Sequence, residues 1–181
     1  MMRQAPTSTR PPSVRIRSGI VIARTPRIRR IVEDMLAMAD IRDVEYVPDD
    51  QAAILKLRYE KRSVGFVLCE ADEQIRHHLA IAKYVRWDGS FPLPDLPVVA
   101  IADGWTLPMV TTARDAGITE VIGMPITNYA FMRRFVSALH QERPFIRAAS
   151  YRGPDRRTRS QAAYEGPWRR SSDKSLSQFD R

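Results

Sequence analysis

The chain has 181 residues, and 44% of them are hydrophobic, which is enough for one well-buried domain with some chain to spare and too little for two. No apolar run approaches the roughly 20 residues of a membrane-spanning helix. The N-terminus is polar and has no signal peptide, so we expect a cytoplasmic protein. Its single cysteine, Cys69, excludes an intramolecular disulfide.

The net charge of +8 is concentrated at the two ends of the chain. Residues 1–19 hold four arginines and no acidic residue, and residues 143–181 hold ten basic against four acidic residues, which leaves the middle mildly acidic. The first segment also contains three prolines among Ser, Thr and Arg, a composition that buries too little apolar surface to fold. We therefore predict a disordered basic arm over residues 1–17, a folded domain over 18–142 and a basic, largely disordered tail over 143–181.

Short apolar runs predict five strands. The run that follows Arg62 and ends at Glu70 is the most apolar in the chain, as in a strand that is buried on both faces. Such strands belong to parallel sheets, whose ligand crevice lies outside the carboxyl ends of the strands, so we expect Glu70 at that edge. The predicted strands are residues 20–22, 43–47, 63–70, 96–101 and 120–122, the second of them at the edge of the sheet.

An amphipathic stretch follows each predicted strand. Thr25 offers a cap and Pro26 suits the first turn of the first helix. Asp49 and Asp50 can cap the second helix, and Gly117 can take the left-handed conformation that ends the fourth. The last three helices are predicted over residues 72–87, 107–116 and 128–141.

Strand and helix thus alternate five times between residues 19 and 142. Right-handed crossovers onto a parallel sheet that is covered on both faces satisfy such a pattern. We predict an α/β protein with a flavodoxin-like (βα)5 fold, a doubly wound parallel sheet with strand order 2-1-3-4-5, and disordered extensions at both ends. The fold by itself predicts no activity, because unrelated functions share it.

Several short segments of this domain stand out together. They are Ile20-Val21-Ile22 with the helix of Arg29-Arg30, Val67-Leu68-Cys69, Leu96-Pro97-Val98-Val99, Ala113-Arg114-Asp115-Ala116-Gly117 and the turn Met124-Pro125. With them the domain resembles the receiver domain of bacterial two-component response regulators, the CheY-like family. The resemblance covers residues 18–142 and implies a role in phosphorelay signal transduction. The tail also resembles that of single-receiver, chemotaxis-like proteins of alphaproteobacteria. Its matching residues are Arg143-Pro144-Phe145-Ile146-Arg147, Tyr151-Arg152 and Gly153-Pro154-Asp155-Arg156-Arg157.

The chemistry of that family needs two acids after the first strand to hold magnesium, an aspartate after the third as phosphoryl acceptor, a Thr or Ser after the fourth, and a Lys after the fifth. The matching positions all depart from this pattern: they are Ala23, Arg24, Glu70, Ala102 and Met124. Magnesium binds oxygen ligands, so a methyl group and a guanidinium in place of two carboxylates argue against a metal. Phosphoryl transfer depends on that charge neutralisation. The departures therefore imply a pseudo-receiver with a degenerate pocket, no cofactor and no catalysis.

Two arrangements of the degenerate pocket are open at this point. Glu70 is one methylene longer than the usual acceptor, so a charge-assisted hydrogen bond to Arg24 can stand where metal and phosphate meet and hold one conformation. Alternatively, Arg24 points to solvent and Glu70 is hydrated. The aromatic switch residue of the family corresponds to Val121, which like Ala102 cannot follow a phosphoryl group. We therefore expect a constitutive interaction surface on the fourth and fifth helices and the fifth strand.

Other sites are less well supported. Cys69 ends a buried strand, where a cysteine behaves as a small hydrophobe. His77 and His78 point in different directions on one helix, and His140 has no partner at ligand spacing, which argues against zinc. The turn over residues 23–26 lacks the glycines of a dinucleotide site or a P-loop.

The tail permits three interpretations. It interleaves aromatic residues with arginines, a mixture that binds single-stranded nucleic acid or acidic protein surfaces. It can equally be a solubilising extension, or a segment that folds back on the domain through residues 144–146. No helix-turn-helix module fits within it.

We therefore expect an atypical response regulator that binds protein partners in a bacterial signalling pathway independently of phosphorylation, with no metal and no membrane. The alternative is a receiver-derived regulator that binds nucleic acid through its basic termini. A third hypothesis is a metal-dependent phosphoacceptor that uses Asp72, which lies past the end of the strand and is expected to cap the next helix.

Overall fold

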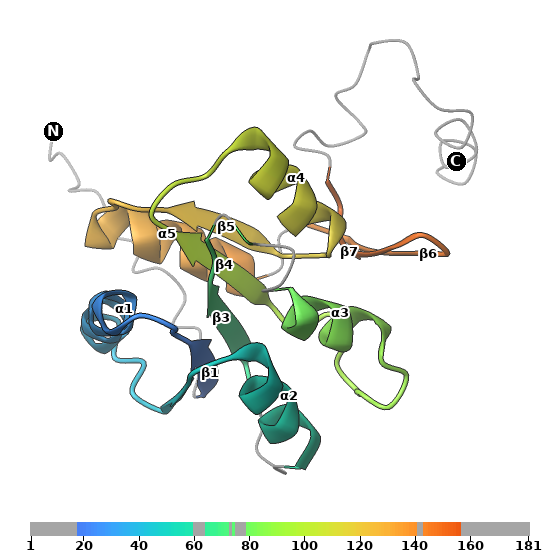
Figure 1. Cartoon of the computed structure of the whole chain (residues 1–181), viewed down its shortest axis with the longest axis horizontal. Helices are drawn as coiled ribbons and strands as arrows, with labels where there is room; N and C mark the ends of the chain where they lie inside the picture. The colour runs from blue at the N-terminus through green and yellow to red at the C-terminus, as the bar shows by residue number, and fades with distance from the viewer. Residues whose placement is uncertain (1–17, 60–63, 73, 75–78, 141–142, 157–181) are drawn as a thin grey trace, which may run out of the picture.

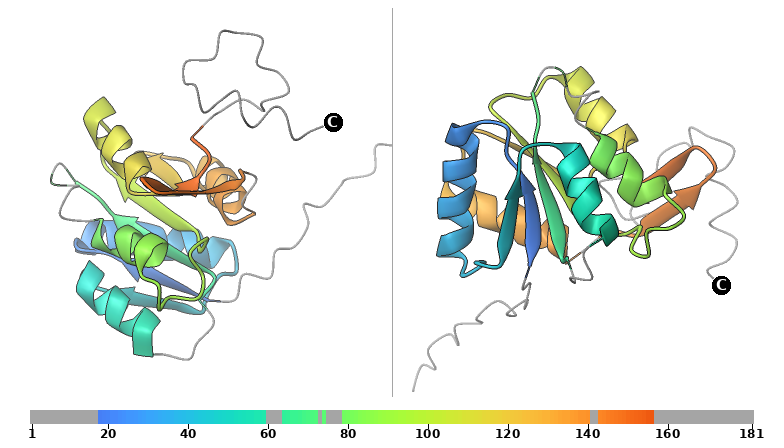
Figure 2. Two further views of the ribbon diagram at one scale, coloured as in Figure 1. Left: turned by 90° about the vertical axis from the view of Figure 1, so that its right-hand side faces the viewer. Right: turned by 60° about the horizontal axis from the view of Figure 1, so that its bottom comes forward.

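A computed structural model describes residues 18–59, 64–72, 74, 79–140 and 143–156. Parallel strands form a five-stranded sheet in the order β2-β1-β3-β4-β5, with helices on both of its faces (Figures 1 and 2). This arrangement confirms the predicted flavodoxin-like fold and its strand order. The strands are β1 (Gly19–Ile22), β2 (Val44–Val47), β3 (Phe66–Glu70), β4 (Val98–Ala102) and β5 (Glu120–Gly123).

The helices follow the strands in alternation. The predicted cap of the first helix is confirmed, because Thr25 Oγ1 accepts a hydrogen bond from the backbone N–H of Ile28 (3.3 Å). The predicted end of the fourth is also confirmed, since Gly117 has φ +85°. The helices are α1 (Pro26–Met38), α2 (Asp50–Tyr59), α3 (Ala80–Trp87), α4 (Leu107–Asp115) and α5 (Asn128–Leu139).

The sheet separates two apolar cores, because successive side chains of a strand point to opposite faces. Val21 and Leu68 pack with α1 and α5 on one face, whereas Ile22 and Cys69 pack with α2, α3 and α4 on the other. The strands β1, β3 and β4 are buried along their whole length. The sequence run that ends at Glu70 is therefore a strand buried on both faces, as predicted.

The third helix begins at Ala80, so the prediction that it begins at Asp72 is wrong. Asp72 instead closes a local turn, in which its Oδ1 accepts a hydrogen bond from the backbone N–H of Gln74 (2.7 Å). The neighbouring residues 73 and 75–78 lie outside the described part of the chain, and with them His77 and His78.

A β-hairpin follows the last helix, and it was not anticipated within the predicted tail. Its strands β6 (Phe145–Ala148) and β7 (Tyr151–Pro154) are antiparallel, and β7 lies against α3 (Figure 2). Residues 143–156 thus fold back on the domain, as one of the three interpretations of the tail has it. Residues 1–17 and 157–181 lie outside the described residues. In the part of the chain that is described, no helix combines the length and hydrophobicity needed to cross a membrane.

Candidate functional site

The carboxyl ends of the central strands bring the five predicted pocket positions to one edge of the sheet. Ala23 and Arg24 follow β1, Glu70 is the last residue of β3, and Ala102 is the last residue of β4. Met124 follows β5, and its backbone N–H donates to the carbonyl oxygen of Ala102 (2.8 Å). The edge is therefore continuous from β1 to β5.

The carboxylate of Glu70 is buried and fully engaged by the turn between β1 and α1. The residue is only 8% exposed. Its Oε2 accepts hydrogen bonds from the backbone N–H groups of Arg24 (2.6 Å) and Thr25 (2.8 Å), and its Oε1 accepts one from the Thr25 hydroxyl (2.7 Å). A carboxylate is an acceptor only, and three donors satisfy most of its capacity. Glu70 therefore holds the β1–α1 turn closed.

The guanidinium of Arg24 points inward, across the ends of two strands. One of its amino groups donates to Asp50 Oδ1 at 2.7 Å, and another donates to the backbone carbonyl oxygen of Glu70. Arg24 and Glu70 are thus linked, but the carboxylate binds the backbone of Arg24 rather than its side chain. The predicted link between Arg24 and Glu70 is therefore present, but the partner whose carboxylate pairs with the Arg24 guanidinium is Asp50, which the sequence predicts only to cap the second helix.

That partner, Asp50, is 5% exposed and joins two helices to the strand edge. Besides accepting from Arg24, its Oδ2 accepts a hydrogen bond from the backbone N–H of Ile81 (3.0 Å), in the first turn of α3. Leu79, the N-cap residue of α3, makes no side-chain capping hydrogen bond. Asp50, from α2, instead accepts the hydrogen bond at the N-terminus of α3. The sequence signal is the Asp49-Asp50 pair: Asp49 alone caps α2, by accepting from Ala52 N–H (2.8 Å), which leaves Asp50 to face inward.

These residues do not fit a magnesium ion. Magnesium needs oxygen ligands in near-octahedral geometry. The two positions that would supply carboxylates hold the methyl group of Ala23 and the guanidinium of Arg24, whose positive charge lies against Asp50 and the Glu70 carbonyl oxygen. Among the described residues, no group of three or more His, Cys, Asp or Glu side chains is placed to hold a metal ion.

Apolar side chains occupy the positions that respond to a phosphoryl group in the resembled family. Ala102 is buried, and Val121 is half-buried on β5. Trp105 lies beside β5 and donates its indole N–H to the carbonyl oxygen of Ile122 (2.9 Å). Ala102 and Val121 have no side-chain donor or acceptor, so neither can exchange a hydrogen bond with a group in the pocket.

Cys69 is a free and fully buried residue of β3. Burial raises the pKa of its thiol to about 12, and the nearby negative charge of Asp50 adds to the effect. The thiol is therefore protonated at neutral pH, and the nucleophile in thiol chemistry is the thiolate. This environment agrees with the prediction that Cys69 is a core residue.

The tail motif forms the second strand of the hairpin and its exit. Gly153 and Pro154 are buried in β7, and the backbone N–H of Asp155 donates to the carbonyl oxygen of Pro144 (2.8 Å). Arg156 pairs with Asp115 at the end of α4 (2.7 Å). Arg157 lies outside the described residues. The motif thus closes the hairpin against the domain.

The hairpin covers Arg86, an arginine that is only 1% exposed. Its guanidinium donates to the carbonyl oxygens of Gly117 (2.9 Å), Pro94 (2.8 Å) and Leu96 (2.8 Å), and more weakly to the Thr119 hydroxyl (3.2 Å). Burial lowers the pKa of Arg86 to about 10, so the group stays charged at neutral pH. Backbone carbonyls rather than a hydrogen-bonded carboxylate therefore compensate this buried charge.

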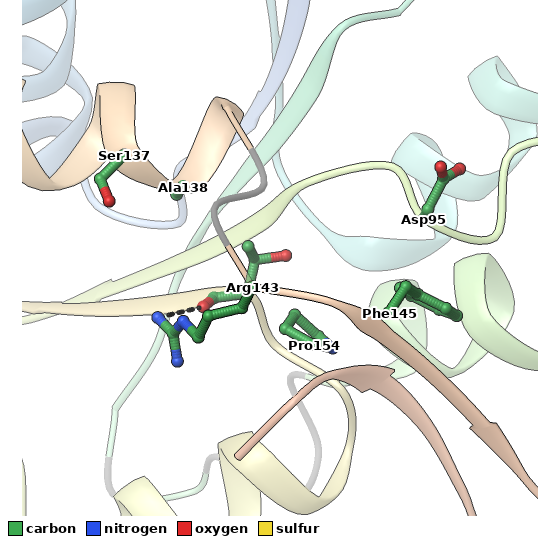
Figure 3. A pocket seen from close by; sticks show the side chains of 7 residues that line it. Asp95, Ser137, Ala138, Arg143, Phe145 and Pro154 are labelled. Carbon is green, nitrogen blue, oxygen red and sulfur yellow. Dashed lines mark hydrogen bonds between the residues drawn. The ribbon is translucent and has the colours of Figure 1, made fainter. Parts of the chain in front are cut away.

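Phe145, the first residue of β6, holds the hairpin against Arg86. Its ring centroid lies 5.5 Å from the Arg86 guanidinium, and with Pro154 it faces a small cavity of about 50 Å³ (Figure 3). At the rim of that cavity, Arg143 donates to the carbonyl oxygen of Thr119 (3.3 Å) and to Glu120 Oε2 (2.8 Å). The hairpin is thus fixed to β5 and to α3.

No protein-family model and no curated protein matches the sequence. Solved structures do match: the receiver domain of a sensor histidine kinase from Pseudomonas aeruginosa, with a magnesium ion coordinated in its active-site cleft, gives a TM-score of 0.58 at 14% identity and covers 68% of this chain and 98% of its own. The chain has the receiver fold. Chemotaxis protein CheY4 from Vibrio cholerae (TM-score 0.57, 15% identity) shares it, again over 68% of this chain and 98% of its own. A response regulator from Thermotoga maritima does so with a TM-score of 0.57, 18% identity and the same coverage.

A receiver fold at these identities carries no activity with it, because function depends on the site. In this receiver fold the site is built from Glu70, Arg24 and Asp50, which bind one another or the backbone beside them.

Proposed function

We propose that this protein is an atypical response regulator, a pseudo-receiver, which transmits a signal by binding protein partners without being phosphorylated and without catalysing a reaction. One observation carries the proposal: the charged groups at the pocket already form hydrogen bonds and an ion pair with residues of the domain itself. Three donors engage the Glu70 carboxylate, and the Arg24 guanidinium bridges the Glu70 carbonyl oxygen and Asp50.

The energetics of these contacts disfavour a phosphoryl acceptor. A phosphoryl donor must approach a carboxylate oxygen in line, and both oxygens of Glu70 are held by the β1–α1 turn. Hydrogen bonds to a charged group contribute about 1.5–3 kcal/mol each. Breaking these hydrogen bonds costs free energy, which contacts to a metal ion and a lysine would have to offset. This chain has Ala23, Arg24 and Met124 at the positions that would supply those contacts.

A pocket that is closed in this way favours one surface conformation rather than a switch between two. A ligand shifts an equilibrium only by its different affinity for two states. Ala102 and Val121 offer no polar group through which such a difference can arise. A constitutive surface for a protein partner is the function that remains for the domain.

The experiment is a labelling reaction with acetyl phosphate. The full-length protein is incubated with radiolabelled acetyl phosphate and magnesium, beside the Glu70→Gln variant and a conventional receiver domain as positive control. We expect the control alone to take up label. Uptake by the wild-type protein that is lost in Glu70→Gln would overturn the proposal. A pull-down from a cell extract with the full chain and with a chain ending at residue 156 then tests whether the domain and its hairpin suffice for partner binding.

The nucleic-acid alternative depends on the arginines of both basic termini, residues 1–17 and 143–181, of which only residues 143–156 lie within the described part of the chain. Binding to a generic oligonucleotide that weakens steeply with salt concentration would favour that alternative.

A further inference from the structure

A groove runs between α4, β5 and the β6–β7 hairpin, with a volume of about 510 Å³. Three apolar residues line it and are here called its floor: Ile118 is buried, and Val110 and Val121 are half-buried. One of its walls exists only because the hairpin folds back on the domain, since Tyr151 and Pro154 line it. The groove is therefore a joint product of the receiver fold and the tail motif.

The charged residues that line the groove are here called its rim, and they carry more positive than negative charge. Four arginines line it, against the carboxylates of Glu120 and Asp155. The arginines come from α4, α5, the segment before β6 and the end of the hairpin: they are Arg114, Arg134, Arg143 and Arg156.

Contacts within the domain hold these guanidinium groups along the rim. Arg134 and Arg143 share the single carboxylate of Glu120, at 2.8 Å from Oε1 and 2.8 Å from Oε2 respectively. Arg114 donates to the carbonyl oxygen of Arg156, whose own guanidinium pairs with Asp115 (2.7 Å). A guanidinium has five N–H donors, so each keeps donors for a further acceptor.

We propose that this groove binds an acidic segment of a partner protein, with apolar side chains on the floor and carboxylates at the arginines of the rim. The inference rests on the proposed function and names the chemistry of the partner. Arginine recognises carboxylates through paired N–H donors, and pre-positioned guanidinium groups lose little conformational entropy on binding. An apolar centre with a polar rim is the arrangement of protein–protein interfaces.

Two other occupants fit the groove less well. Single-stranded nucleic acid is bound partly by stacking of its bases on aromatic faces, but Arg156 covers the ring of Tyr151 at 3.8 Å, and the Tyr151 hydroxyl donates to the carbonyl oxygen of Pro154 (2.7 Å). The chain's own residues 157–181 carry six basic and three acidic residues, so their net charge is repelled by a cationic rim.

The test compares two neighbouring arginines of α5 in the full-length protein. Arg134 lines the groove, whereas Arg133 is exposed and does not line it. The probe is a fluorescein-labelled peptide in which glutamate alternates with leucine, and fluorescence anisotropy measures its affinity. We expect Arg134→Gln to weaken binding about two- to fivefold, the effect of one partly exposed ion pair. Arg133→Gln removes the same charge and leaves the affinity unchanged.

Two further measurements sharpen the test. Val110→Glu places a negative charge on the half-buried floor, and we expect about a tenfold loss of affinity with an unchanged circular dichroism spectrum. A matched peptide with glutamine in place of glutamate is expected to bind at least about fivefold more weakly than the glutamate peptide.

The outcomes separate the inference from the proposed function. Equal losses for Arg133→Gln and Arg134→Gln, equal affinity for the two peptides, or no binding of the glutamate peptide each overturn the groove as the acidic site. An oligonucleotide that displaces the peptide and itself binds more weakly to Arg134→Gln than to Arg133→Gln assigns the groove to nucleic acid. Phosphoryl labelling at Glu70 overturns the proposed function and leaves the contrast between the two arginine variants intact.

Discussion

Arg24 and Asp50 form an ion pair that is mostly removed from water, with side-chain exposures of 20% and 6%. A carboxylate so deeply buried is stable only with full compensation. Here Arg24 supplies the opposite charge and the N-terminus of α3 supplies an N–H donor, from Ile81. Because Arg24 also binds the carbonyl oxygen of Glu70, one guanidinium links β1, β3 and α2.

A double-mutant cycle tests this pair. We expect Arg24→Gln and Asp50→Asn each to lower the free energy of unfolding by about 2 kcal/mol, since each leaves a buried group of the partner without its counter-charge. The double variant is expected to lose at least about 1 kcal/mol less than the sum of the two, because its members are in direct contact. Urea unfolding measures all four free energies.

The exposed pair Arg42–Asp40 is the control for that cycle. Its members are bonded at 2.9 Å, but their side chains are 78% and 87% exposed. Water screens such a pair, so the coupling in an Arg42→Gln and Asp40→Asn cycle is expected to stay below about 0.5 kcal/mol. Additive losses at Arg24 and Asp50 would contradict the assigned role of that pair.

The β6–β7 hairpin adds a layer to the receiver fold and is held by charge as much as by apolar contact. Arg86 lies beneath it, Arg152 stacks on the Trp87 ring at 4.6 Å, and Arg156 pairs with Asp115. The close approach of the hairpin to the domain depends on two facing glycines: a Cβ at Gly117 would lie 2.4 Å from the carbonyl oxygen of Arg152. The glycine of the tail motif is therefore a packing requirement.

Substitution of Gly153 tests that requirement. A Cβ at this position would lie 2.6 Å from the Tyr151 hydroxyl oxygen and 2.8 Å from Gly117 Cα, so Gly153→Ala must shift β7. We expect the free energy of unfolding to fall by about 1–3 kcal/mol, as in overpacked interiors. Trypsin is expected to cleave faster after the exposed Arg147, which mass spectrometry can follow.

Gly89 provides the matched control for that substitution. A Cβ there meets nothing within 4 Å, so Gly89→Ala is expected to change the free energy of unfolding by less than about 0.5 kcal/mol. Equal behaviour of the two alanine variants would show that the hairpin tolerates a side chain at Gly153.

The architecture of the whole domain was predictable because its strands are local sequence features. An unbroken apolar run ending at Glu70 is typical of a strand buried on both faces of a parallel sheet, and five alternations of strand and helix leave few topologies. The pocket positions were predictable for the same reason, since each lies at the end of a strand or directly after it. What a single sequence does not specify is the partner of a side chain that reaches across the sheet, as Arg24 does to Asp50.

The hairpin and its buried arginine were not predicted, for a related reason. Residues 143–156 are polar, rich in arginine and short of apolar periodicity, which is also the composition of a disordered tail. Arg86 stands beside Trp87 at the end of a helix, where an arginine is usually solvated. Its burial depends on three carbonyl oxygens from Pro94, Leu96 and Gly117, which only the folded loops bring together.

These contacts predict that the folding unit does not end at residue 142 but includes the hairpin through residue 156. A chain cut after 142 loses Phe145, whose ring lies over the Arg86 guanidinium, and exposes a charge that is now 1% accessible. We expect it to lose at least about 2 kcal/mol of free energy of unfolding relative to a chain cut after 156, the contribution of one or two aromatic side chains. Urea unfolding measures the difference directly.

The labelling rate of Cys69 gives a second measure, because a fully buried thiol with a pKa of about 12 reacts only when the domain opens. Equal stability and equal labelling of the two chains would show that the hairpin does not contribute to the stability of the domain.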